Sequence, residues 1–152
     1  MTKTDSFIKN RILWKAGQFK LPSGSSFYFG DLSPTLQTYL QQYMEPDKSA
    51  LPVLFFTKPS KEWTLVCTRQ VICNNNQIVF SINLNEIENL RPAIFDKWTR
   101  SWMPTYPEDR KGEWHEVVVN DKMGHSHTLH ADKGKDLFAL WNVLLLLWRI
   151  LT

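Results

Sequence analysis

The chain has 152 residues, 43% of them hydrophobic, which is enough for one compact domain (residues 1–152) without disulfides or metals. Its 18 lysines and arginines stand against 15 aspartates and glutamates, so the net charge of +3 does not predict nucleic-acid binding by itself. Two cysteines and an N-terminus without an apolar leader predict reduced thiols and a cytoplasmic location.

Basic side chains gather near the amino end of the chain. Residues 1–30 carry five lysines and arginines against a single aspartate, a local charge of +4. Such a cluster is either a solvated face or a binding surface for anionic lipid, inositol phosphate or an acidic protein. Residues 7–21 fit both helix and strand spacing, so their secondary structure stays open. The residues that would bind lipid are Lys9, Arg11, Lys15 and Lys20.

A helix is predicted from Ser33 to about Met44. Serine is a favoured N-cap and proline a favoured first helical residue, and both occur here in that order. Apolar residues then recur at the spacing of one helix face, and Pro46 is expected to end the helix. That face consists of Leu36, Tyr39, Leu40 and Tyr43.

The middle of the chain predicts antiparallel strands. Residues 51–57 are mostly apolar, and residues 63–73 alternate apolar and polar side chains around a bend at Arg69. The three asparagines at 74–76 are typical of a tight turn, because asparagine tolerates a positive φ. Residues 77–82 then form the returning strand of a hairpin.

The last third of the chain begins with a segment that has no periodic pattern and continues with a predicted hairpin. Residues 93–112 combine tryptophan, proline and charged residues without a period, which indicates a long loop or insertion. Residues 114–120 and 125–131 predict a hairpin around the turn at 121–124.

Residues 132–152 predict a C-terminal helix, with Asp132 or Asp136 at its start. Its apolar side chains cover nearly the whole circumference, so we expect a sheet on one side and either N-terminal residues or another chain on the other. The apolar run of about a dozen residues is too short for a membrane span of roughly 20. Self-association of the protein would use Trp141, Leu145 and Trp148.

Two segments resemble bacterial pleckstrin-homology-like (PH-like) and GRAM-like domains. The run from Trp63 to Ile72 resembles the strand, threonine, bend and strand of that family, and the run from Asn85 to Leu90 resembles its next acidic, isoleucine-bearing segment. The final hairpin and helix match the way the family ends, so the resemblance covers roughly residues 51–151. It implies an α+β fold in which a bent antiparallel sheet is closed by the C-terminal helix, and a role in binding. The fold would then comprise a PH-like core (51–152) and an N-terminal extension (1–50) with an additional helix.

Residues suited to catalysis are few. His125, His127 and His130 have the composition of a zinc site, but in a regular strand His130 points away from the other two. The alternation in the central strands puts Cys67 and Cys73 on an apolar face, where buried inert thiols are the usual outcome. A metal-dependent enzyme using His125 and His127 is therefore the alternative to a binding protein, and we predict no cofactor and no metal.

A protein-interaction module is the leading functional hypothesis. The irregular segment between residues 93 and 112 has the tryptophan, tyrosine and arginine composition of interface hot spots, although the same rings could instead pack on the core. A small bacterial domain of this kind could be an immunity-type inhibitor of a toxin. A nucleic-acid partner is not expected, because acidic residues are spread through the rest of the chain. The predicted partner-binding residues are Trp98, Arg100, Trp102, Tyr106 and Arg110.

Overall fold

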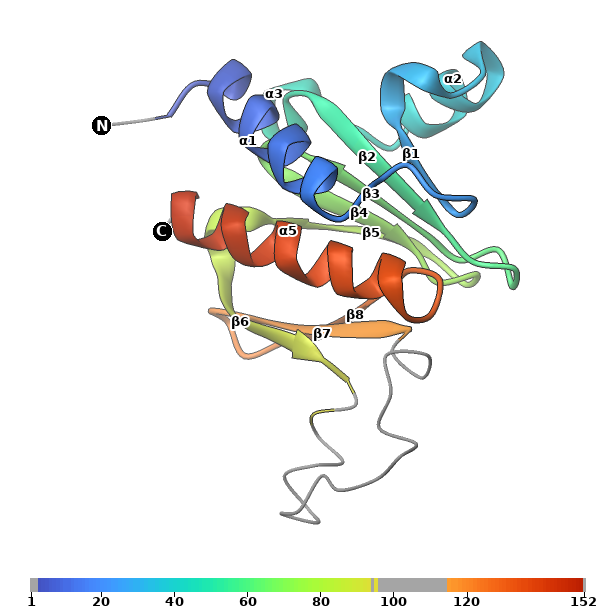
Figure 1. The fold of residues 1–152 in the computed structure, drawn as a ribbon. Helices are drawn as coiled ribbons and strands as arrows, with labels where there is room; N and C mark the ends of the chain where they lie inside the picture. Colours follow the sequence, from blue (N-terminus) through green and yellow to red (C-terminus); the bar gives the residue numbers. More distant parts are fainter. Residues whose placement is uncertain (1–2, 94, 96–114, 152) are drawn as a thin grey trace.

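Two antiparallel sheets and two long helices form the fold in the computed structural model, which describes residues 3–93, 95 and 115–151 (Figure 1). The first sheet has the strand order β1-β2-β3-β4-β5, and the second has the order β6-β7-β8. The predicted α+β class is confirmed, but the strands are divided between two sheets instead of being continuous in one. The strands are β1 (Ser26–Tyr28), β2 (Pro52–Thr57), β3 (Trp63–Cys67), β4 (Gln70–Asn74), β5 (Val79–Asn83), β6 (Ile87–Pro92), β7 (Glu116–Asp121) and β8 (Ser126–His130). The helices are α1 (Asp5–Gln18), α2 (Pro34–Gln41), α3 (Pro46–Ser49) and α5 (Lys135–Leu151), with 3-10 turns η1 (Phe29–Asp31) and η2 (Leu84–Glu86).

The segment whose structure the sequence left open is the helix α1. The Thr4 hydroxyl caps it by accepting a hydrogen bond from the Phe7 amide at 3.1 Å. Ile8, Ile12 and Ala16 follow one another at four-residue intervals and are fully buried. They belong to the same apolar core as α5, beside which α1 lies in Figure 1, so α1 is part of the core.

The predicted second helix is confirmed at its start and shorter at its end. Ser33 caps α2 and Pro34 is its first residue. The helix stops at Gln41, three residues before the predicted end, and Pro46 begins the short helix α3 instead of only terminating α2. Proline fits there because the first helical residue needs no amide donor.

The five-stranded sheet is buried on both faces. One face packs under α2, and the other faces α1 and α5. Cys67 lies in the α2 cluster and Cys73 in the α5 cluster, so the prediction that both cysteines share a face is wrong. The reason is the two-residue connection between β3 and β4, which pairs Val66 with Val71 and therefore matches even positions with odd ones.

The two sheets meet where β8 crosses the inner face of the larger sheet. Thr64, Cys73 and Phe80 stand opposite one another on β3, β4 and β5, and this row contacts β8. The Thr64 hydroxyl donates to the His130 carbonyl at 2.6 Å and accepts from the His130 amide at 3.1 Å. The Phe80 ring stacks on His127 with centroids 5.8 Å apart. Polar and aromatic contacts therefore hold β8 against the inner face of the five-stranded sheet.

The C-terminal helix α5 is present as predicted, and it covers the junction of the two sheets (Figure 1). Asp136 lies in the first turn of α5, as expected, and Asp132 precedes the helix. The carboxylates of Asp132 and Asp136 accept hydrogen bonds from the hydroxyls of Ser25 and Ser23 at 2.9 and 2.7 Å, respectively. These bonds tie the loop before β1 to α5. Among the described residues, no helix has the length and apolar character needed to cross a bilayer.

Candidate functional site

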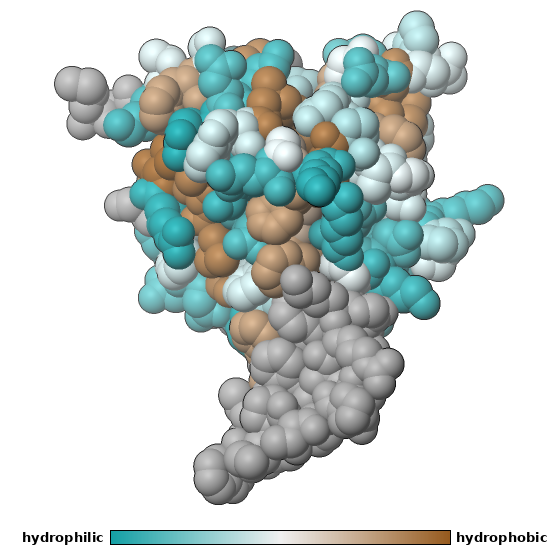
Figure 2. Space-filling model, in the orientation of Figure 1, coloured by the Kyte–Doolittle hydropathy of each residue, from teal (hydrophilic) through white to brown (hydrophobic). Residues whose placement is uncertain are grey.

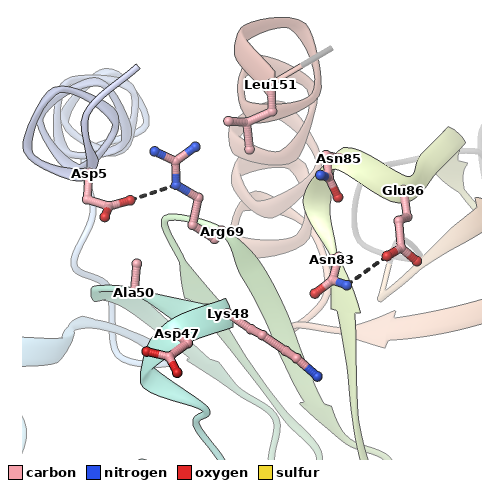
Figure 3. A pocket seen from close by; sticks show the side chains of 9 residues that line it. All are labelled: Asp5, Asp47, Lys48, Ala50, Arg69, Asn83, Asn85, Glu86 and Leu151. Carbon is pink, nitrogen blue, oxygen red and sulfur yellow. Dashed lines mark hydrogen bonds and ion pairs between the residues drawn. The ribbon is translucent and has the colours of Figure 1, made fainter. Parts of the chain in front are cut away.

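A polar cavity of about 420 Å³ opens at the end of β5 (Figure 3). Side chains from α1, α3, the β3–β4 turn, β5, η2 and the end of α5 surround it. It adjoins a smaller cavity of about 200 Å³, with which it shares Lys48, Asn83 and Glu86. We call the two together the β5 groove. The larger cavity is lined by Asp5, Asp47, Lys48, Ala50, Arg69, Asn83, Asn85, Glu86 and Leu151, and the smaller adds Glu45, Gln70, Ser81, Ile82, Asp121 and His127.

Carboxylates outnumber cations in the β5 groove. Its lining has five acidic side chains against one lysine and one arginine, an excess of three negative charges. Arg69 is bound to Asp5 at 2.7 Å and also donates to the Lys3 carbonyl, and Lys48 lies 3.1 Å from Glu45, so two of the five acids are paired inside the groove. The side-chain amide of Asn83 donates a hydrogen bond of 2.7 Å to the Glu86 carboxylate and orients it. The net negative potential of the groove favours binding of a cationic group.

The outer face of α1 carries two exposed aromatic rings among cations, and we call it the α1 ridge. Phe7 and Trp14 are seven residues apart, 42% and 51% exposed, and therefore on the same side of the helix. The Arg11 guanidinium lies 4.6 Å from the Trp14 ring, with Lys15 at 5.9 Å, and Lys3 lies 5.3 Å from Phe7. Figure 2 shows the side of the molecule formed by α1 and α5, where hydrophobic side chains lie among hydrophilic ones.

The structure does not gather the four predicted lipid-binding residues into one pocket. Arg11 and Lys15 flank Trp14 on the α1 ridge. Lys9 lines a separate cavity of about 440 Å³ between α1 and the start of β2. Lys20 lines another, of about 290 Å³, with Lys135 at the start of α5. Only Arg11 and Lys15 therefore form a local site.

The histidines separate into two groups at the ends of β8. His127 Nε2 donates a hydrogen bond of 2.9 Å to Asp121 Oδ2, and His125 Nδ1 lies 3.6 Å from the same carboxylate oxygen. The hydrogen bond from His127 lowers the pKa of Asp121. No set of three metal-binding side chains with suitable geometry occurs in residues 3–93, 95 and 115–151.

The second group surrounds the ammonium of Lys58, whose side chain is only 9% exposed. Lys58 Nζ lies 3.0 Å from His130 Nδ1 and 3.2 Å from His115 Nδ1, and Glu62 and Glu116 also face His130. Burial lowers the pKa of His130, and the nearby Lys58 charge lowers it further. A hydrogen bond from Ser60 is the main reason that the pKa of Glu62 falls to about 2. This cluster joins the β2–β3 turn to β7 and β8.

A pH dependence of stability follows from His130. Because its pKa is lower in the folded protein than in the unfolded chain, the unfolded chain binds the proton first as pH falls. We expect the free energy of unfolding to decrease below about pH 6.5 and to level off once the folded imidazole is also protonated. Urea unfolding between pH 8 and pH 5 measures this decrease.

The matched variant is His130→Asn, whose amide oxygen can accept the Lys58 hydrogen bond without titrating. It should flatten the curve in that window. Glu62 loses its contribution only between its ordinary pKa of 4.5 and about 2, so it does not confuse the comparison. An unchanged slope in His130→Asn would assign the effect to other groups.

Both thiols are buried and inert in character. Burial raises the pKa of Cys67 to about 12 and that of Cys73 to about 11. A thiolate nucleophile at neutral pH needs the opposite shift. The sequence correctly predicted that both cysteines are buried, but the prediction that they share one face of the sheet is wrong.

The predicted partner-binding residues Trp98, Arg100, Trp102, Tyr106 and Arg110 lie outside the described residues. The three residues proposed for self-association are half-buried against the core: Trp141, Leu145 and Trp148. The Trp148 indole donates to the Ile87 carbonyl at 3.1 Å, so this ring holds α5 to the second sheet.

The sequence analysis missed the β5 groove and the Lys58 cluster. Their members come from segments far apart in the sequence, such as Asp5 and Leu151, and no local pattern joins them. The α1 ridge had a local signal, since Phe7 and Trp14 share a helical face once the segment is known to be a helix.

A scan against family models, a search of curated proteins and a search of solved structures found no match for this chain. Its class rests on the fold alone: the described residues form an α+β protein with a five-stranded and a three-stranded antiparallel sheet.

Proposed function

We propose that this chain is a non-catalytic, PH-like binding module that recognises another protein through the α1 ridge. The order of elements supports the PH-like assignment: β2 to β8 follow one another in antiparallel pairs within two sheets, and α5 then covers their junction. The resemblance of residues 63–72 and 85–90 implies the same order. A cytoplasmic location and an immunity-type role are consistent with this module.

The observation that carries the proposal is the exposure of Phe7 and Trp14 with cations on their rings. Their helix is anchored by its opposite face, so the rings are held rigidly and lose little conformational freedom on binding. Tryptophan and arginine are the residue types that dominate interface hot spots. Residues 98–110, which lie outside the described residues, have the same composition.

The test removes the rings and keeps the charges. The double variant Phe7→Ser, Trp14→Ser should no longer capture the partner proteins that the wild type captures. It should bind a purified partner at least about tenfold more weakly, because each hot-spot ring contributes over about 1 kcal/mol. The control variant Ile78→Ser, Met123→Ser removes two exposed apolar side chains elsewhere, 60% and 78% exposed, and should keep binding. Equal binding by the ring variant and the control would refute the ridge as the interface.

Binding to an anionic membrane surface is the second candidate, and the same ridge favours it. Interfacial helices combine aromatic rings with lysine and arginine, as Trp14 does here with Arg11 and Lys15. Sedimentation with phosphatidylserine vesicles separates the two candidates. Lipid attachment should fall steeply with ionic strength and be lost in Arg11→Gln, Lys15→Gln, whereas an aromatic protein interface should change little with salt.

A further inference from the structure

We infer that the outer edge of β5 accepts an extended, basic segment of a partner protein, which adds a strand to the five-stranded sheet within the β5 groove. The side chains that line this site are not those of the α1 ridge, and the inference does not depend on the proposed function. It rests on the direction of the β5 backbone groups, on the hollow beside them and on the charge of that hollow.

The register shows which backbone groups of β5 point outward. The Asn75 amide donates to the Ile78 carbonyl, and the Leu84 amide donates to the Arg69 carbonyl. Bonded pairs in an antiparallel ladder recur every two residues, so Phe80 and Ile82 bond to β4. The amides and carbonyls of Val79, Ser81 and Asn83 therefore point away from the sheet, where no strand of the described part pairs with them.

The sequence of β5 lacks the features that usually protect an edge. Its five residues include no proline, no lysine and no other charge, and its pairing with β4 has no bulge. The opposite edge of the sheet, β1, has only three residues. Strand addition to an exposed edge is a common mode of peptide recognition, in which backbone bonds supply affinity and side-chain pockets supply specificity.

The acidic lining of the hollow beside the edge determines which side chains a bound segment would need. Ser81 and Asn83 line the smaller cavity together with the acids Glu86 and Asp121. The larger cavity continues from Asn83 to Asp47 of α3 (Figure 3). Asp121 has a lowered pKa and stays ionised, so the excess of carboxylates persists at neutral pH. Lysine or arginine side chains at alternate positions of an added strand would face these acids.

The test uses the full chain and a displayed library of ten-residue segments with lysine or arginine at every second position and valine, threonine or isoleucine between them. The library should yield binders, and a matched library with glutamate at the charged positions should not. Ser81→Pro removes one outward amide, a change that an edge strand tolerates on its solvent side. We expect it to weaken selected segments at least about tenfold.

Two controls keep the result interpretable. Ser81→Ala keeps the amide and should bind within about twofold of the wild type, and Glu86→Gln should bind more weakly and with less dependence on salt. In the wild type, the selected segment should slow exchange of the Ser81 and Asn83 amides, a readout that does not require the proline variant to fold. Equal binding by Ser81→Pro and Ser81→Ala, unchanged exchange of these amides, or no preference for the basic library would overturn the inference.

Discussion

Leu144→Asp is expected to leave the protein largely unfolded at room temperature. Leu144 is fully buried in the core that α1, α5 and both sheets share. Shortening such a leucine costs about 2–5 kcal/mol, and an unpaired carboxylate in its place adds a desolvation penalty of several kcal/mol more. The total is comparable to the whole stability of a typical domain, about 5–15 kcal/mol. Loss of the cooperative urea transition, followed by circular dichroism, measures this.

The control for Leu144→Asp introduces the same side chain on the same helix at an exposed position. Lys135→Asp lies in the first turn of α5, where a negative charge is favoured by the helix dipole. We expect it to change the free energy of unfolding by no more than about 0.5 kcal/mol. Wild-type stability in Leu144→Asp would contradict the packing of α5 described here.

The elements that the sequence predicted well are those with a strong local period or turn signal. The hairpin of β4 and β5 is present as expected, although its turn spans 75–78 and not 74–76, and β7, β8 and α5 lie within a few residues of their predicted bounds. The α1 segment was left open for a physical reason. Phe7 and Trp14 point outward while Ile8 and Ile12 point inward, so apolar residues occupy both sides of the helix and give no single stripe.

What the sequence did not predict depends on contacts between distant segments. The reversal of face between Cys67 and Cys73 depends on the length of a connection, which shifts the register by one residue. His130 was assessed as a metal ligand from its neighbours in sequence, whereas its actual partner, Lys58, is 72 positions away. The β5 groove likewise needs the tertiary fold, because its acids come from separate elements.

Thr64→Val should destabilise the protein by about 2–4 kcal/mol, because one hydroxyl makes two bonds between the sheets. Thr64 is fully buried, and both the amide and the carbonyl of His130 bond to its oxygen. Valine has nearly the same shape but cannot replace either bond, and each buried backbone group left unsatisfied costs about 1–3 kcal/mol. For a domain of this length, the expected loss corresponds to a fall in Tm of roughly 5–15 °C.

Thr57→Val is the matched control, since it removes the same atom from a half-buried threonine on the neighbouring strand. The Thr57 hydroxyl donates a long hydrogen bond of 3.5 Å to the carbonyl of Glu62, in the connection between β2 and β3, and this bond does not join the two sheets. We expect a loss below about 1 kcal/mol there. Hydrogen exchange adds a local readout, because the His130 amide should exchange faster in Thr64→Val alone. Equal losses in the two variants, with unchanged exchange at His130, would mean that apolar packing of α5 holds the sheets together without this bridge.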